Sequence, residues 1–229
     1  MGKEQAHLLG KRLYNTLFDF VYCSDLNRTR QTCDNILFHQ PQDTDMSVFY
    51  CKELWEIKVD GVEGQSWDVE QKIRHDPKTT FRMSKTGEKD ESWADVFLRV
   101  SKFFDGLIQK FVDAKYSSGV SESNYIEINS KKDEEYLTAK EVKEMFDKGE
   151  LTNKNVKENG GDKKVLIVAH GGILAEMVNN VLYRLGKKIA LEVESHNCTL
   201  YRIRVHKKEN EEGKVDISVE LFDDYSHLN

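Results

Sequence analysis

The segment VLIVAHGG at residues 165–172 constrains the fold of this chain more than any other part of its sequence. A continuous apolar run ends at His170, and two glycines follow it. Ile173, Met177 and Val181 then recur at helical spacing. A buried strand, a tight glycine turn and a helix make up the α/β unit whose helix N-terminus binds phosphate. The segment therefore predicts an α/β fold in which an anion can meet the end of a strand.

Similar strand and helix signals occur earlier in the chain. Residues 18–23 and 47–54 are apolar enough to form strands, and Ser24 with Asp25 offers an N-cap for a helix over residues 26–38. A further helix is expected over residues 4–17, with an apolar stripe formed by Ala6, Leu9, Leu13 and Leu17.

The later segments complete the pattern. Residues 115–164 are rich in Ser, Asn, Lys and Glu, and we interpret them as a polar insertion with one short helix that begins at a Thr138 and Glu141 capping box. Alternating segments at 199–205 and 215–221 predict a hairpin. A long amphipathic helix is predicted over residues 92–114, with an apolar face formed by Val96, Val100, Phe103, Leu107 and Phe111.

Helices that alternate with apolar strands predict a three-layer α/β domain with a mostly parallel sheet. The chain has 229 residues, which suffice for one such domain over residues 1–229 once the polar insertion at about 115–164 is set aside. We expect no second domain.

The balance of charge and the cysteine pattern exclude several classes of protein. Asp and Glu exceed Lys and Arg by 40 to 34, giving a net charge of −6 that argues against a dedicated nucleic-acid binder. No apolar run approaches the roughly 20 residues of a membrane span, and the first residues form no signal-peptide core. The four cysteines form no zinc pattern, which predicts a reduced, cytoplasmic protein without a metal site.

Two polar residues stand where strands end and helices begin. The glycines after His170 clear space above it, so that His170 and the N–H groups of Gly171 and Gly172 can meet an anion. A histidine hydrogen-bonded to the backbone of its turn is the alternative. Arg28 can present a bidentate fork to phosphate, or it can form a surface ion pair with Asp25.

Glu91 begins the long helix and is a third candidate. A carboxylate at a helix N-terminus is stabilised by the helix dipole and often only caps the helix. To act as a general acid, Glu91 needs a raised pKa, which requires burial near an anion.

Together these motifs resemble the histidine phosphatase superfamily, which has the phosphoglycerate mutase-like fold. The matching segments follow the family's order: GKEQAHLLG from Gly2, CSDLNRTRQT from Cys23, LWEIKVDGVEG from Leu54, ESWADVFLRV from Glu91, VLIVAHGG from Val165, and Asn197 with Cys198. Asp90 departs from the pattern, because it stands where the family has a glycine before Glu-Ser. The order of motifs and the insertion look most similar to the TIGAR-type fructose-2,6-bisphosphatases.

The resemblance implies phosphoryl transfer without a cofactor. In the family a histidine of an N-terminal R-H-G motif takes the phosphoryl group, which divides one displacement into two. The resemblance implies that Arg28, His170 and Gly171 bind the phosphoryl oxygens, with His170 stabilising their charge. It also implies that Glu91 protonates the leaving oxygen and then activates water. The implied partner is a small phosphorylated metabolite, with neither nucleic acid nor a membrane involved.

The R-H-G motif does not occur in the 229 residues. The only Arg-His pair, Arg74 with His75, lies in a polar stretch with no strand before it, and no other histidine has a fitting context. We therefore expect the sheet to lack its central first strand and the chain as written to be inactive. Two other interpretations stay open: a pseudophosphatase that binds phosphorylated ligands, and a phosphoglycerate mutase.

Overall fold

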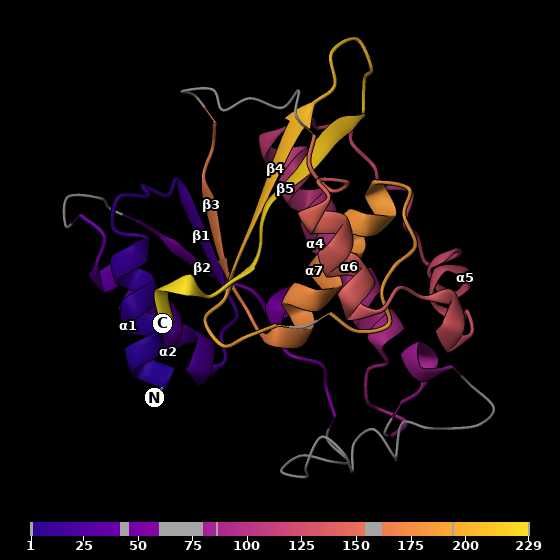
Figure 1. Cartoon of the computed structure of the whole chain (residues 1–229), viewed down its shortest axis with the longest axis horizontal. Helices are drawn as coiled ribbons and strands as arrows, with labels where there is room; N and C mark the ends of the chain where they lie inside the picture. The colour runs from indigo at the N-terminus through magenta and orange to yellow at the C-terminus, as the bar shows by residue number, and fades with distance from the viewer. Residues whose placement is uncertain are drawn as a thin grey trace.

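Three short apolar strands form a parallel sheet at the centre of the fold. In the computed structural model, β1 (Phe20–Cys23) lies between β2 (Val48–Tyr50) and β3 (Val165–Val168), and both pairs are parallel (Figure 1). The register sets Cys23 opposite Tyr50 and Val168, so the carboxyl ends of the strands lie together at one edge. The structure describes residues 2–41, 46–59, 80–85, 87–153, 162–193 and 195–228.

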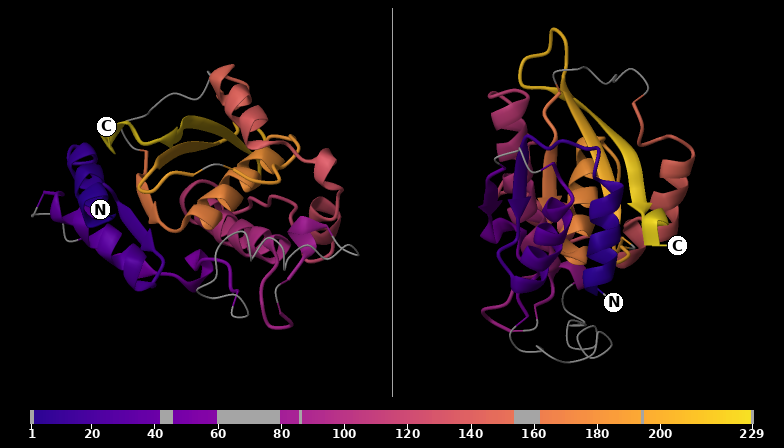
Figure 2. Two further views of the ribbon diagram at one scale, coloured as in Figure 1. Left: turned by 60° about the horizontal axis from the view of Figure 1, so that its bottom comes forward. Right: turned by 90° about the vertical axis from the view of Figure 1, so that its left-hand side faces the viewer.

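Helices cover both faces of this sheet because its side chains alternate between them. Val21 and Cys23 pack with α1 and α2, whereas Phe20 and Tyr22 pack with α4 and α7. Figure 2 shows these helices on the two sides of the sheet. These longer helices are α1 (Gly2–Arg12), α2 (Asn27–Phe38), α4 (Trp93–Phe111) and α7 (Gly171–Arg184). The predicted α/β fold with a mostly parallel sheet is confirmed.

The C-terminal segments form the predicted antiparallel hairpin. It consists of β4 (Leu200–Lys207) and β5 (Val215–Asp224), and its apolar side chains pack against α4 and α7. Asn210 and Gly213 take positive φ angles of 62° and 73° between the two strands. Within the described residues β3 pairs only with β1, and β4 pairs only with β5. The hairpin is therefore a sheet separate from the parallel one.

The polar insertion holds more structure than its composition predicts. It contains α5 (Tyr125–Asn129) as well as α6 (Ala139–Asp147), so the expectation of one short helix is wrong. The capping box is confirmed, since the side chains of Thr138 and Glu141 each accept from the other's backbone N–H. The insertion also buries scattered apolar residues that polar runs separate in sequence, namely Tyr116, Tyr136, Val142 and Leu151.

The N-cap of α2 differs from the predicted one. Leu26 occupies the cap position without a side-chain hydrogen bond. Ser24 and Asp25, the predicted cap residues, bind elsewhere: Ser24 Oγ contacts His170, and Asp25 accepts from the Trp55 indole N–H. Tertiary contacts therefore outweigh the local capping preference of these two side chains.

Other boundaries also shift. Helix α1 ends at Arg12, and Leu17 is 54% exposed, so the predicted stripe stops one turn earlier. The predicted strand over residues 47–54 ends at Tyr50, and the 3-10 turn Lys52–Leu54 follows it. Helix α4 buries a face that includes Phe97, Phe104 and Ile108, because the insertion and the hairpin cover it beyond the predicted stripe.

Among the described helices, none is both long and apolar enough to cross a membrane.

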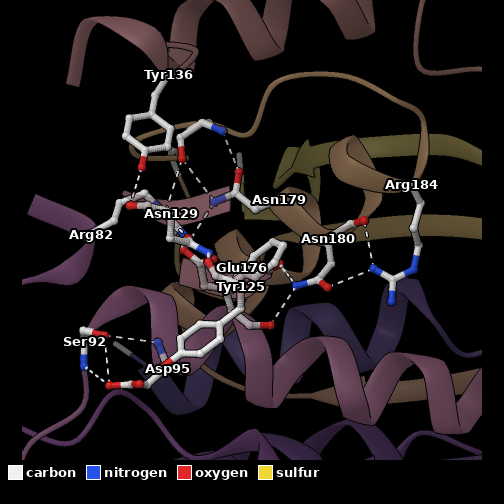
Figure 3. Close-up of polar contacts among 12 residues, drawn as sticks. Arg82, Ser92, Asp95, Tyr125, Asn129, Tyr136, Glu176, Asn179, Asn180 and Arg184 are labelled. Carbon is white, nitrogen blue, oxygen red and sulfur yellow. Dashed lines mark hydrogen bonds and ion pairs between the residues drawn. The ribbon is translucent and has the colours of Figure 1, made fainter. Parts of the chain in front are cut away.

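The buried Arg82, in the 3-10 turn Phe81–Met83, joins the insertion to α7 through an ion pair and a hydrogen bond. Arg82 donates from Nη1 and Nη2 to the two carboxylate oxygens of Glu176 at 2.9 and 2.6 Å (Figure 3). Its Nε donates to Asn129 Oδ1 at 2.8 Å. The two charged side chains are only 0% and 3% exposed. Because Asn129 ends α5 and Glu176 lies within α7, Arg82 fixes the insertion on the helix that starts at Gly171 and Gly172.

We predict that Glu176→Gln lowers the free energy of unfolding by about 3–5 kcal/mol, because it leaves the Arg82 charge buried without its counter-charge. The matched control is Glu122→Gln, which breaks the exposed ion pair with Lys102 and should change the free energy of unfolding very little. Urea denaturation of both variants measures the difference. Equal losses in the two variants would contradict the assignment of this pair as a structural anchor.

Candidate functional site

The carboxyl ends of β1 and β3 bring the predicted site residues together. Ser24 directly follows β1, and its N–H donates to the Val168 carbonyl at the end of β3 at 3.0 Å. His170 is the N-cap of α7, and Arg28 lies in the first turn of α2. Two helix N-termini therefore converge on one point, where their N–H groups favour an anion.

Arg28 and His170 are in direct contact. Arg28 Nε donates to His170 Nδ1 at 3.0 Å, and His170 Nε2 lies 2.9 Å from Ser24 Oγ. A guanidinium only donates, so Nδ1 accepts and the imidazole proton resides on Nε2. Within the described residues the Nη groups of Arg28 make no hydrogen bond, and Arg28 forms no ion pair with Asp25. The surface ion pair that was the alternative for Arg28 is thus not the arrangement found.

His170 is held neutral at physiological pH. His170 is only 7% exposed to solvent. Burial lowers the pKa of its imidazole from 6.5 to about 4, and the positive charges of Arg28 and Arg99 lower it further in the same direction. A neutral imidazole with its proton on Nε2 can donate one hydrogen bond to an anion. The site thus offers a neutral hydrogen-bond donor at His170 beside the positive charge of Arg28.

The first two N–H groups of α7, those of Gly171 and Gly172, differ in their hydrogen bonding. The Gly171 N–H has no partner among the described residues, as expected for the first residue of a helix. The Gly172 N–H, predicted to be free as well, instead donates to the carboxylate of Glu56. A Cβ at Gly172 would lie 2.6 Å from Glu56 Oε1 and 2.7 Å from the Trp93 ring, so only glycine fits this position.

Glu56 is the site residue that sequence reasoning missed. Burial raises the pKa of Glu56, although N–H groups of Ile57 and Gly172 and the charges of Arg28 and Arg99 oppose the shift. The only sequence signal that could have identified Glu56 as a site residue is its position in the LWEIKVDGVEG motif. Its burial arises from Trp93 and Gly172, which are distant in sequence.

Glu91 has a different environment from the one its predicted role needs. Its Oε1 and Oε2 accept from Arg99 Nε and Nη2, each at 2.8 Å, and Oε2 also accepts from the Lys58 N–H at 3.1 Å. Arg99 Nη1 in turn donates to the carbonyls of Glu53 and Trp55 at 2.7 and 3.0 Å. The ion pair of Glu91 with Arg99 therefore holds the segment that carries Glu56 in position. The capping that Glu91 was a candidate for belongs to Ser92 and Asp95, which form a capping box at the start of α4 (Figure 3).

Two cavities meet at these residues. A groove of about 700 Å³ is lined by Arg28, His170 and Gly171 and runs along β3. A smaller pocket of about 360 Å³ lies beside it and is lined mainly by apolar side chains, including Trp93. Glu56 and Gly171 line both, so a ligand bound at Gly171 can extend into either space.

Other sequence candidates fall at the edge of the site or outside the described residues. His196 lines the groove, and its Nδ1 lies 2.7 Å from Asp223 Oδ2, although the sequence gave it no role. The Glu63 and Gly64 pair of the LWEIKVDGVEG motif, and the pair of Arg74 with His75, lie outside the described residues. The part of the chain that the structure describes holds no cluster of three or more His, Cys, Asp or Glu side chains suited to a metal ion.

We predict that the low pKa of His170 makes stability depend on pH between about 6.5 and about 4. The unfolded chain binds the proton in this window and the folded chain does not, so the free energy of unfolding falls as the pH falls, by about 3 kcal/mol over the window. His170→Gln removes this titrating group, so the free energy of unfolding of the variant should fall by about 3 kcal/mol less between pH 6.5 and pH 4. Urea denaturation of the two chains from pH 7 to pH 4 checks it, and parallel curves would contradict it.

The chain resembles known proteins in both sequence pattern and fold. No curated protein sequence matches it. Similar solved structures include YhfR of Bacillus stearothermophilus, with a TM-score of 0.58 and 15% identity over 100% of this chain and 85% of that one. Phosphoglycerate mutase of Bacillus anthracis has a TM-score of 0.59 and 16% identity over 99% of this chain and 82% of that one. Mycobacterial glucosyl-3-phosphoglycerate phosphatase, in complex with inorganic phosphate, has a TM-score of 0.57 and 14% identity over 99% and 87%.

At these identities the structural likeness establishes the phosphoglycerate mutase-like fold and nothing more. The model of the histidine phosphatase superfamily (branch 1) matches residues 1–118, which is more than half of the 229 residues. This chain belongs to the histidine phosphatase superfamily, branch 1.

Proposed function

We propose that this chain supplies the phosphate-binding and proton-transfer groups of a phosphomonoesterase that acts on a small phosphorylated metabolite. The observation that carries the proposal is the contact of Arg28 Nε with His170 Nδ1, beside the Gly171 N–H at the start of α7, which has no partner in the part of the chain that the structure describes. A cationic fork, a neutral imidazole and a helix N-terminus are together a suitable site for a phosphoryl group. The similar phosphatase of known structure binds inorganic phosphate.

In the proposed reaction Arg28 binds the phosphoryl oxygens with its Nη groups, and Gly171 donates its N–H to a third oxygen. His170 turns its Nε2–H from Ser24 toward the phosphoryl group, whose negative charge favours the imidazole proton. These donors are in place before the reaction and act where water is partly excluded, so they stabilise charge that builds up during transfer. The small apolar pocket beside Gly171 accommodates the organic part of the substrate.

Glu56 is the better placed proton donor. Its raised pKa lets it hold a proton near the site, and its carboxylate lies against the Gly172 N–H where both cavities meet. It protonates the leaving oxygen as the P–O bond breaks and takes a proton from water in the second step. The same role was predicted for Glu91, whose described contacts are with Arg99 and Lys58. On this geometry we assign Glu91 to positioning.

The nucleophile of this proposal is an R-H-G histidine from outside the 229 residues. Its imidazole forms an N–P bond as the leaving oxygen departs, and water then breaks that bond to release phosphate. The chain by itself is accordingly proposed to bind phosphorylated ligands without turning them over. The pseudophosphatase interpretation shares this binding but has no nucleophile in any form, and the mutase differs in returning the phosphoryl group to the product.

Two finer assignments are part of the proposal. Fructose-2,6-bisphosphate is the substrate that the order of motifs favours, and a panel of sugar phosphates and 3-phosphoglycerate tests it. A reducing, cytoplasmic location agrees with the four cysteines, which are all free thiols in the structure.

We predict that Arg28→Ala weakens the binding of inorganic phosphate about tenfold or more, since charge-assisted hydrogen bonds contribute about 1.5–3 kcal/mol. Arg30 provides a matched control on the same helix, because it donates to the Asp25 carbonyl and stacks on Tyr50. Arg30→Ala should change the affinity less than about twofold, since it loses no hydrogen bond to the ligand. Isothermal titration calorimetry measures both. Equal losses would place the phosphate site elsewhere.

We also predict a difference between the two carboxylates once an R-H-G segment is fused ahead of residue 1. Glu56→Gln should lower kcat by about 10²–10⁴ for an alkyl phosphate, which needs a protonated leaving group. The loss should be much smaller for p-nitrophenyl phosphate. Glu91→Gln should lower both activities alike. The unfused chain, assayed as the baseline, should not exceed its His170→Ala variant. A leaving-group dependence in Glu91→Gln alone would return the acid role to Glu91.

A further inference from the structure

A second histidine lies at the rim of the site, and its side chain is fixed in place. The backbone N–H of His196 donates to Asp223 Oδ1 at 3.1 Å, and its Nδ1 lies 2.7 Å from Asp223 Oδ2. The imidazole also packs against the ring of Tyr225, with the two centroids 3.9 Å apart. Because a carboxylate only accepts hydrogen bonds, Nδ1 carries a proton and donates it to Asp223. Nε2 is therefore the ring nitrogen of His196 that is left to meet a ligand.

An unusual backbone conformation supports this contact. Asp223 lies near the end of β5 and has a φ angle of 45°, in the left-handed region that few residues other than Gly, Asn and Asp enter. Its side chain is 12% exposed, whereas that of His196 is 48% exposed. A carboxylate bound to one ring nitrogen sets the direction of the other. His196 thus presents Nε2 in one orientation at the surface of the groove.

His196 is close to the residues that we propose to bind phosphate. It lines the 700 Å³ groove together with Arg28 and His170. The residue before it, Ser195, borders the start of α7, since a Cβ at Gly171 would lie 3.9 Å from Ser195 Cβ. Because consecutive Cα atoms are about 3.8 Å apart, the Cα atoms of Gly171 and His196 are separated by no more than about 11 Å. A small sugar or glycerate with an anionic group at each end can span this separation.

The two cavities that meet at the site differ in charge. The charged side chains that line the apolar pocket are all acidic, namely Glu56, Glu176 and Glu192. Arg82 neutralises Glu176 but does not itself line the pocket. The groove, in contrast, is lined by Lys3 and Arg28 as well as by the two histidines, with Glu56 as its acidic side chain. A second anionic group on a ligand is therefore repelled from the pocket and attracted to the groove.

The surroundings of His196 suit an anion better than a neutral group. When an anion binds at Nε2, the imidazole can hold a proton on each nitrogen, and each proton then faces a negative charge, that of Asp223 or that of the ligand. The Tyr225 ring against the imidazole stabilises a positive charge on it. A neutral ligand at Nε2 gains a single hydrogen bond without this charge.

We propose that His196, oriented by Asp223, binds a second anionic group of the substrate. The site then selects small metabolites that carry a phosphate or a carboxylate in addition to the phosphoryl group that is removed. This inference rests on the proposed function, because it names the substrate class of the same site. His196 is a specificity-determining residue, and Asp223 is a positioning residue that acts through it.

The test is isothermal titration calorimetry of the 229-residue chain with matched pairs of ligands. Fructose 2,6-bisphosphate is compared with fructose 6-phosphate, and 3-phosphoglycerate with glycerol 3-phosphate, so that each pair differs in the second anionic group. In at least one pair His196→Ala should weaken the doubly anionic ligand about tenfold or more, because a charge-assisted hydrogen bond is lost. Its partner and inorganic phosphate should change less than about twofold. The absence of a selective loss in both pairs would overturn the proposal.

Lys3 is the matched control for positive charge in the groove. It lines the same groove but is exposed, and a well-solvated ammonium group on a long side chain gains little from one ion pair. Lys3→Ala should therefore weaken the doubly anionic ligand less than about threefold. A loss equal to that of His196→Ala would indicate general attraction by positive charge and would refute a defined site at His196.

A double-mutant cycle tests the role of Asp223. Asp223→Asn removes the charge but keeps a residue that tolerates the left-handed backbone. It should weaken the doubly anionic ligand about threefold to tenfold in the parent chain and less than about twofold in the His196→Ala chain. Equal losses in the two chains would show that Asp223 acts on the fold rather than through His196, which contradicts its assignment.

Inorganic phosphate separates this inference from the proposed function. If Arg28→Ala weakens phosphate binding and His196→Ala has no selective effect, the proposed function stands and the inference fails. If His196→Ala is selective while Arg28→Ala leaves phosphate binding unchanged, the anion site at His196 is established and the proposed function fails.

Discussion

The pairing of β1 with β3 is the constraint on which the rest of the structure depends. Cys23 lies opposite Val168, so the residues just beyond each strand, Ser24 and the pair of Ala169 with His170, meet at one edge. This register places the first turn of α2 beside the N-terminus of α7. A slip of one residue would turn His170 to the other side of the sheet, where no cationic side chain of α2 could reach it. The contact of Arg28 with His170 thus depends on strand register rather than on loop shape.

A second layer of ion pairs keeps this edge in place. The pair of Glu91 with Arg99 holds the carbonyls of Glu53 and Trp55, and with them the chain on either side of Glu56. Arg82 pairs with Glu176 of α7, six residues after His170, and donates to Asn129 of the insertion, so it ties the two together. The insertion is polar in composition, but through Arg82 it helps to hold α7 in position at the site. Buried pairs of this kind are costly to desolvate, and their value lies in fixing one geometry.

Sequence patterns predicted the parts of the fold whose signal is local. The apolar run before His170, the capping box at Thr138 and the alternating hairpin each carry their periodicity within a few residues, and the structure confirms them. The parts that were missed depend on distant partners. Glu56 looks like an ordinary loop carboxylate until Trp93 and Gly172 bury it, and Ser24 leaves its capping role because His170 competes for its hydroxyl. The unpredicted helix of the insertion, α5, has only five residues, which is too short for a helical stripe to show in the sequence.

Gly172 shows how tightly these segments fit together. The space that its missing side chain leaves is filled by a carboxylate oxygen from the segment after β2 and by the indole ring at the start of α4. Three segments, from the N-terminal, middle and C-terminal thirds of the chain, thus share a volume the size of one methyl group. None of the three positions can change size unless another gives way. Residues 56, 93 and 172 should therefore vary together among related sequences, so that their combined changes, rather than the conservation of each one, record how the Glu56 carboxylate is kept against the start of α7.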